Sequence, residues 1–235
     1  MSETIAARAT SSCRAMMTLD QARARTRAAT VQLPSRGGQG VLVPGGFVLT
    51  AAHCIDWYLS GGMALGDYCL EGITTQAGTA FALSVYAVEP VSDMAVLGSA
   101  DGQAFYDDAE AFEAWCAETI PIPVCSADFD LEVTVPVHIL AHTGAWTRAR
   151  ATRHGLPGES PGSCVYIMAE RGLESGTSGS PVIDDAGRLV GVVSWSGGVD
   201  GDAPLEGMMP RPHLALPGWI WRRIEAATTA VRCDN

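Results

Sequence analysis

Short apolar runs separated by glycine and proline are the feature that most limits how this chain can fold. The runs "GVLV" and "FVLT" flank Pro44, Gly45 and Gly46 and predict a hairpin, because glycine accepts the backbone angles of a tight reversal. Six more runs are typical of β-strands, at 81–88, 94–98, 131–141, 164–169, 181–183 and 189–195. With 26 Gly and 13 Pro in 235 residues, this punctuation favours an all-β protein over a helical bundle.

Two segments have helical spacing instead. Residues 101–123 alternate acidic and apolar positions until prolines end the pattern, which predicts a helical connector between two halves. Residues 216–232 place Trp219, Ile220, Ile224 and Ala227 on one apolar face and predict a closing helix. We therefore expect three parts: a basic N-terminal extension (1–28), a first β-barrel with the connector helix (29–118), and a second β-barrel with the closing helix (119–235).

The N-terminal segment differs in charge from the remainder of the chain. Residues 1–27 contain five arginines and two acidic residues, a net charge of +3, whereas the whole chain carries −11. Two interpretations stay open. The segment is either a solvated, partly helical extension or an arm that docks on the acidic body or on a partner.

Composition excludes several functions. All 15 basic residues are arginine, so a phosphate-binding lysine, a Schiff base and a lysine base are excluded, and "GGQG" at 37–40 is not a nucleotide site. An acidic surface repels nucleic acid and anionic membranes, and neither is an expected partner. No apolar stretch is long enough to cross a membrane, and the segment around Arg8 and Arg14 does not resemble a secretory signal, so we expect a cytoplasmic protein.

No metal or cofactor is expected. His138 and His142 are four residues apart in a strand that enters a turn, where this spacing does not gather ligands as it does on a helix. No two cysteines have the spacing of a zinc or redox motif, so we expect mostly reduced, buried thiols. The seven are Cys13, Cys54, Cys69, Cys116, Cys125, Cys164 and Cys233.

Three separate segments contain candidate catalytic residues. His53 ends the apolar run "GFVLTAAH", Asp93 lies in "PVSDMAVL", and Ser178 lies between glycines in "ESGTSGSP". A serine hydroxyl attacks a carbonyl only when a base removes its proton, and a histidine oriented by an aspartate is such a base. The backbone N–H groups of Gly176 and Ser178 are candidates to hold the resulting oxyanion.

The segments "LTAAHC", "SDMAVL" and "SGTSGSPV", followed by "LVGVVSW", resemble the trypsin-like serine proteases, and the bacterial members most. The resemblance extends from about residue 29 to the C-terminal helix. It implies a chymotrypsin-like fold of two six-stranded antiparallel β-barrels, with the site between them. It also implies a serine endopeptidase in which His53 is the general base, Asp93 orients it, Ser178 is the nucleophile, and Gly176 and Ser178 form the oxyanion hole.

The same resemblance implies where a protein or peptide substrate would bind. Ser194, Trp195 and Ser196 would lie on the strand that pairs with the substrate backbone. Gly172 would lie at the base of the specificity pocket, with Ser196 and Gly207 at its walls. Because no acid occupies the base, a large apolar or aromatic side chain is expected before the cut, unless Glu174 or Asp200 reaches the pocket from a nearby loop.

Two departures from the family pattern carry predictions. Thr177 replaces the aspartate that, in digestive members, binds the new N-terminal amine after activation. The oxyanion hole should therefore be preformed or be switched by a regulatory protein partner. Gly38 replaces the usual disulfide partner of Cys54, so Cys54 should be a free, buried thiol.

The sequence also admits two rival interpretations. "GESPG" at 158–162 fits the nucleophile elbow of α/β-hydrolases, with His213 as the histidine, but Ser160 precedes a proline and glycine, and the alternation of strands and helices is missing. The second rival is a catalytically inactive binding or scaffold module with a protease fold. Since all three catalytic residue types and the glycines are present, the enzyme is the preferred interpretation.

Overall fold

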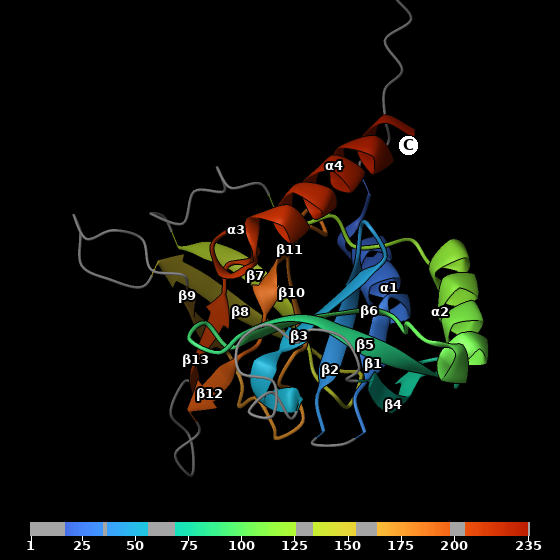
Figure 1. Ribbon diagram of the computed structural model, residues 1–235. Helices are drawn as coiled ribbons and strands as arrows, with labels where there is room; N and C mark the ends of the chain where they lie inside the picture. The colour runs from blue at the N-terminus through green and yellow to red at the C-terminus, as the bar shows by residue number, and fades with distance from the viewer. Residues whose placement is uncertain are drawn as a thin grey trace, which may run out of the picture.

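Two antiparallel β-barrels lie side by side, with helices around them (Figure 1). The computed structural model describes residues 17–34, 37–55, 69–125, 134–153, 164–197 and 205–234. The first barrel is closed, in the strand order β1-β2-β3-β6-β5-β4, and β4 pairs back with β1. Its strands are β1 (Thr30–Gln32), β2 (Gln39–Val43), β3 (Phe47–Ala51), β4 (Cys69–Thr75), β5 (Ala80–Glu89) and β6 (Met94–Ser99). The predicted hairpin is present as β2 and β3.

The second barrel is a sheet in the order β11-β10-β7-β8-β9-β13-β12. β11 and β12 are two halves of one strand, interrupted at residues 193–194, and together they close the ring: Ser194 N–H donates to Met208 O (2.9 Å), and a Cβ on Gly191 would lie 2.6 Å from Pro210 O. Counted this way, the barrel has six strands, which confirms the predicted pair of six-stranded barrels. The bounds are β7 (Val135–Leu140), β8 (Trp146–Arg153), β9 (Cys164–Ala169), β10 (Pro181–Asp184), β11 (Leu189–Val192), β12 (Trp195–Gly197) and β13 (Leu205–Pro210).

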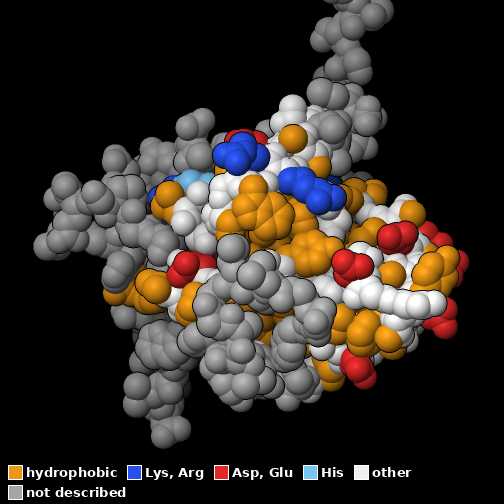
Figure 2. Space-filling model, viewed as in Figure 1, with side chains coloured by type: hydrophobic (Ala, Val, Ile, Leu, Met, Phe, Trp, Pro, Cys, Tyr) orange, Lys and Arg blue, Asp and Glu red, His pale blue; other side chains and the backbone are white. Residues whose placement is uncertain are grey.

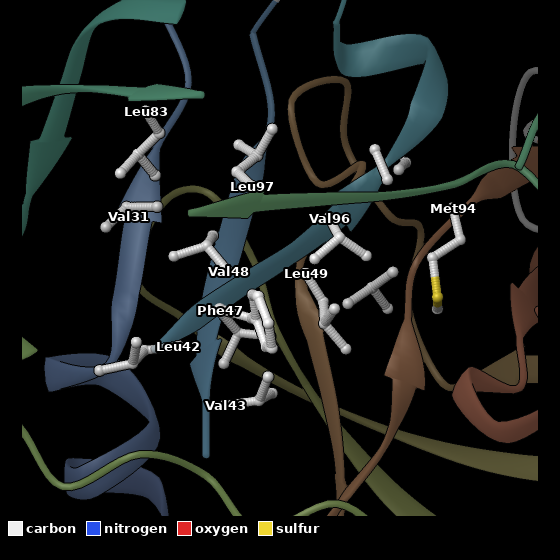
Figure 3. Close-up of a cluster of buried hydrophobic side chains, with 14 of the residues drawn as sticks. Val31, Leu42, Val43, Phe47, Val48, Leu49, Leu83, Met94, Val96 and Leu97 are labelled. Atoms are coloured by element: carbon white, nitrogen blue, oxygen red, sulfur yellow. The ribbon is translucent and has the colours of Figure 1, made fainter. Parts of the chain in front are cut away.

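The core of the first barrel is built from large aliphatic and aromatic side chains. Every residue of β2 and β3 is buried, because one face of each strand points into the barrel and the other is covered by neighbouring elements. Phe47, Leu49 and Leu97 lie together in this core (Figure 3). Burial of each such side chain stabilises the fold by about 1.5–3 kcal/mol.

Helix α2 (Tyr106–Glu118) is the predicted connector helix and covers one side of the first barrel (Figure 1). Its Phe112 and Trp115 rings pack on Phe81 of β5, at centroid distances of 5.3 and 5.6 Å. Asp108 accepts a hydrogen bond from the Ala82 N–H (2.8 Å), which fixes the helix to the same strand. Acidic side chains are visible over the α2 side of the molecule (Figure 2).

The chain ends with α3 (Pro212–Ala215) and the predicted closing helix, α4 (Gly218–Asp234). Ile220 and Ile224 are fully buried, and Thr228 continues the same stripe at four-residue spacing. The expectation that Trp219 belongs to the buried face was wrong: it is 49% exposed, because it lies about 100° around the helix from Ile220. None of the described helices is long and apolar enough to span a membrane.

Helix α1 (Leu19–Ala28) shows that part of the basic N-terminal segment docks on the body. Thr18 and Gln21 form a capping box at its start, and Ala22 and Thr26 are buried. Arg25 donates to Pro121 O, and Arg27 donates to Gly144 O (2.7 Å). The docking interpretation therefore holds for this helix. Residues 1–16 lie outside the described ranges, and the domain boundaries stay predictions.

Arg23 of α1 also completes the hydrogen bonding of a buried histidine. His138 is 1% exposed, and its Nδ1 accepts from the Arg23 guanidinium (3.1 Å), because arginine can only donate. Its Nε2–H then donates to Asp185 Oδ1 (2.8 Å). Both ring nitrogens are used within the fold, so His138 is a structural residue.

Replacing Arg23 should destabilise the protein through this histidine. Arg23→Met leaves the buried Nδ1 of His138 without its donor, which should lower the free energy of unfolding by about 1–2 kcal/mol. Urea denaturation followed by tryptophan fluorescence measures the change. Arg222→Met, at an exposed arginine of α4, is the matched control. Equal midpoints for the two variants would contradict the assigned role.

Candidate active site

His53 is placed by the end of a buried strand. The 3₁₀ turn Ala52–Cys54 follows β3 directly, and the Ala52 N–H donates to Asp93 O (3.1 Å), which holds the turn against the start of β6. Cys54 is buried, whereas the His53 side chain is 46% exposed. The strand end therefore presents an imidazole at the surface from a rigid support.

Asp93 holds the histidine by two hydrogen bonds. Its Oδ1 accepts from the His53 backbone N–H (2.8 Å), and its Oδ2 accepts from the ring Nδ1–H (2.7 Å). With the proton on Nδ1, the neutral ring has a free acceptor at Nε2. The Ser194 hydroxyl also donates to Oδ2 (2.6 Å), so the second barrel contributes to the same carboxylate.

Asp93 has an unusual backbone conformation. Its φ is +58°, and it is the only non-glycine residue among those described with a positive φ. Such a conformation costs about 1–2 kcal/mol. It persists because the surrounding hydrogen bonds fix the carboxylate, a pattern common where a side chain is held for function.

The pair shifts the pKa of both groups. The Asp93 hydrogen bond is the largest cause that raises the pKa of His53 above its ordinary value, the Cys54 sulfur adds to this, and burial opposes it. For Asp93, burial acts to raise the pKa, but the hydrogen bonds from His53 and Ser194 outweigh it, and the pKa is lowered. The site therefore favours an ionised carboxylate beside a strongly basic imidazole.

Ser178 lies in a turn in which, among the described residues, every second backbone N–H group donates a hydrogen bond to a backbone carbonyl. Thr177 N–H donates to Glu174 O (3.2 Å), and Gly179 N–H donates to Val193 O (2.7 Å). The N–H groups of Gly176 and Ser178 have no acceptor among the described residues. Gly176 has φ +91° at the third position of the turn closed by Thr177, which is the geometry of a type II turn.

The Ser178 turn is joined to the first barrel beside His53. Gln39 of β2 donates its N–H to Ser178 O (2.8 Å). A Cβ on Gly38 would lie 2.5 Å from Cys54 Sγ and 2.9 Å from Ser178 O, so the neighbour of His53 and the backbone of Ser178 converge on one glycine. Among the described residues, no hydrogen bond joins the Ser178 hydroxyl to the His53 ring. In free enzymes such bonds are often long and shorten when substrate binds.

The residues predicted to bind substrate lie on β12 and β13 and in the segments that lead into β12 and into the Ser178 turn. Gly172 is exposed, and Gly207 is buried on β13, opposite Ser196 of β12. Trp195 also lies on β12, but the side chains of Trp195 and Ser196 are outside what the structure describes. Ser194 has a contact that the sequence did not predict, the hydroxyl donation to Asp93. Ser160 and Asp200 lie outside the described residues.

Two residues at the junction were missed by sequence reasoning. Gln39 is 1% exposed, and its side-chain oxygen accepts from the Ser180 hydroxyl. The His142 ring lies 3.3 Å from where a Cβ on Gly176 would be, and its Nε2 is 3.9 Å from Glu174 Oε2. Neither contact has a local signal, because the partners are separated by 141 residues (Gln39 and Ser180) or lie in different loops.

The two barrels have the chymotrypsin-like arrangement. A family model described as a trypsin-like peptidase domain matches residues 38–192, which is more than half of the chain, so the chain belongs to this family. One solved structure with this fold is the Rv3671c protease in an inactive form, at 21% identity and a TM-score of 0.52, covering 83% of this chain and 88% of that chain. Another is the serine endoprotease from Yersinia pestis, at 16% identity and a TM-score of 0.55, covering 89% and 67%.

Comparison with curated proteins gave no match. The family match supports a protease, and the solved structures show the shared fold. The free, buried Cys54 agrees with the prediction that this chain lacks the usual disulfide beside the histidine.

The contact at Gly179 should tolerate no side chain. Its φ is +74°, and a Cβ there would lie 2.0 Å from Gln39 O, so Gly179→Ala combines backbone strain with overpacking and should lower the free energy of unfolding by about 3 kcal/mol. Gly46 has nearly the same φ, +73°, with nothing within 4 Å of a Cβ, so Gly46→Ala should lower it by only about 1 kcal/mol. Chemical denaturation of both variants tests the difference, and equal losses would contradict it.

Proposed function

We propose that this protein is a serine endopeptidase that cleaves peptide bonds through an acyl-enzyme on Ser178. The observation that carries the proposal is the pair of hydrogen bonds from His53 to Asp93, because it leaves Nε2 as the acceptor for a proton. The Ser178 turn, tied to β2 next to His53, supplies the nucleophile. Asp93 orients the imidazole and stabilises the cation that forms.

The proposed reaction has two halves. The Ser178 Oγ attacks the scissile carbonyl while its proton passes to His53 Nε2, and the carbonyl oxygen becomes an oxyanion. When the C–N bond breaks, the same proton passes to the leaving amine, and the acyl group stays on Oγ as an ester. Water then attacks the ester, gives its proton to Nε2, and releases the acid as Oγ takes that proton back.

The oxyanion hole is proposed to be preformed by the N–H groups of Gly176 and Ser178. Support comes from their lack of an acceptor among the described residues, and from the turn that Thr177 closes onto Glu174. Thr177 is 1% exposed and uncharged, so it provides no buried carboxylate for a new N-terminal amine. Donors already aimed at one point cost no reorganisation during the reaction.

We also propose a neutral specificity pocket that takes a large apolar or aromatic side chain before the cut. Cleavage profiling on a peptide library measures the residue preferred before the cut.

A cytoplasmic setting and a regulatory protein partner remain predictions. Both imply that the protease cleaves few substrates, so rapid digestion of casein by the purified protein would count against them.

Loss of Ser178 should abolish both labelling and turnover. A serine-directed phosphonate probe should label the protein, and Ser178→Ala should remove the label and lower kcat for a peptide substrate by about 10⁴-fold or more. Ser99→Ala, at a serine near the end of β6, is the control and should keep both. A folded protein that neither labels nor cleaves would instead favour the inactive binding module.

Activity should depend on the protonation of His53. Proton transfer needs the neutral ring, so kcat/KM should rise with pH through the His53 pKa, with a midpoint above the ordinary value of about 6.5 because Asp93 raises that pKa. In Asp93→Asn the anion is gone, so the midpoint should move to lower pH, while kcat falls by about 10³–10⁴-fold. pH–rate profiles of both proteins measure this, and an unchanged midpoint would contradict the assignment.

A further inference from the structure

A polar cavity of about 120 Å³ lies beside the Ser178 turn, and nothing in the proposed reaction uses it. The described residues of its wall include one arginine, one histidine, and several amide and hydroxyl side chains. The residues that matter for its chemistry are Arg27, Gln32, Gln39, Gln76, His142 and Thr143.

The position of the cavity indicates which part of the substrate, before or after the cleaved bond, would reach it. Gln39, in its wall, donates its N–H to Ser178 O, and His142, also in its wall, packs against Gly176. On the other side of the serine, Gly179 N–H donates to Val193 O, at the start of the segment that leads into β12. The cavity and β12 therefore flank the Ser178 segment from opposite sides. If β12 pairs with the acyl part of the substrate, the cavity lies on the side of the leaving amine.

Arg27 places a positive charge in the wall of the cavity, in a protein that is acidic overall. The Arg27 guanidinium donates to Gly144 O (2.7 Å), and no described carboxylate lies within 4.0 Å of it. Arginine has five N–H donors, so one bond to a carbonyl leaves others for a ligand. None of the described residues that line the cavity is acidic, while the chain carries a net charge of −11.

We infer that this cavity is a subsite for an acidic side chain of the substrate, aspartate or glutamate, at one of the first three positions after the cut; the inference rests on the proposed function. Arg27 supplies the charge-assisted hydrogen bond that a carboxylate accepts. The amide and hydroxyl groups of Gln32, Gln76 and Thr143 can satisfy its remaining lone pairs. A lysine side chain would meet Arg27 as a like charge.

Internally quenched peptides test the inference. One sequence is fixed before the cut, and Glu, Gln or Lys is placed in turn at each of the three positions after it. At one position, kcat/KM should be about tenfold higher for Glu than for Gln, and lower still for Lys. Added salt should reduce the Glu/Gln ratio. Arg27→Gln should bring the ratio to about one, whereas Arg222→Gln, which removes a charge from an exposed position of α4, should leave it unchanged.

A second variant, which adds a negative charge to the cavity wall, covers the case in which Arg27→Gln folds poorly. Gln32 is exposed, and Gln32→Glu should lower the Glu/Gln ratio and improve cleavage of the Lys peptide at the same position. Equal rates for Glu and Gln at all three positions, or a ratio that persists in Arg27→Gln, would overturn the inference. An ester substrate with no residue after the cut, together with phosphonate labelling, reports the proposed function separately. If both of those fail, the function is at fault and not the subsite.

Discussion

The backbone contact between β2 and the Ser178 turn is the constraint on which the site depends. Gln39 donates its N–H to Ser178 O, its carbonyl accepts the Thr50 hydroxyl, and its side chain accepts the Ser180 hydroxyl. Gly179 packs so closely on the Gln39 carbonyl that a Cβ has no room. Since β2 pairs with β3 and His53 follows β3, this contact fixes the proposed base and nucleophile relative to each other.

Asp93 forms the second link between the barrels. Its strained backbone comes from the first barrel, and the Ser194 hydroxyl that binds its Oδ2 comes from the second. The energy stored in a positive φ is offset by three donors that converge on one carboxylate, two of them from His53. The His53–Asp93 geometry therefore depends on the packing of both barrels, although both residues belong to the first.

Strands with large apolar residues could be predicted from the sequence, whereas strands that bury small ones could not. β3 and β6 were expected from their aliphatic runs. β8 was not, because the residues it buries, Thr147, Ala149 and Ala151, are small, and Arg148 and Arg150 alternate with them. β4 was also missed, because Gly72, with φ +72°, breaks its alternation at a bulge. The proposed triad is visible in local motifs, but the roles of Gln39 and His142 depend on contacts that only the folded chain creates.

The three arginines of α1 give this helix its particular role. Arg23, Arg25 and Arg27 donate to a histidine nitrogen and two carbonyl oxygens, all neutral acceptors, so the helix docks without losing its positive charge. An arginine guanidinium can donate to a carbonyl oxygen and still present further N–H donors in the same plane. A lysine ammonium, a compact point charge, has no such planar set of donors. The body as a whole repels an acidic peptide at long range, and this repulsion is set by the net charge of −11. Selectivity at the proposed subsite comes instead from direct contact with Arg27. The net negative charge therefore slows the encounter with an acidic peptide, whereas Arg27 favours an acidic residue once the peptide is bound.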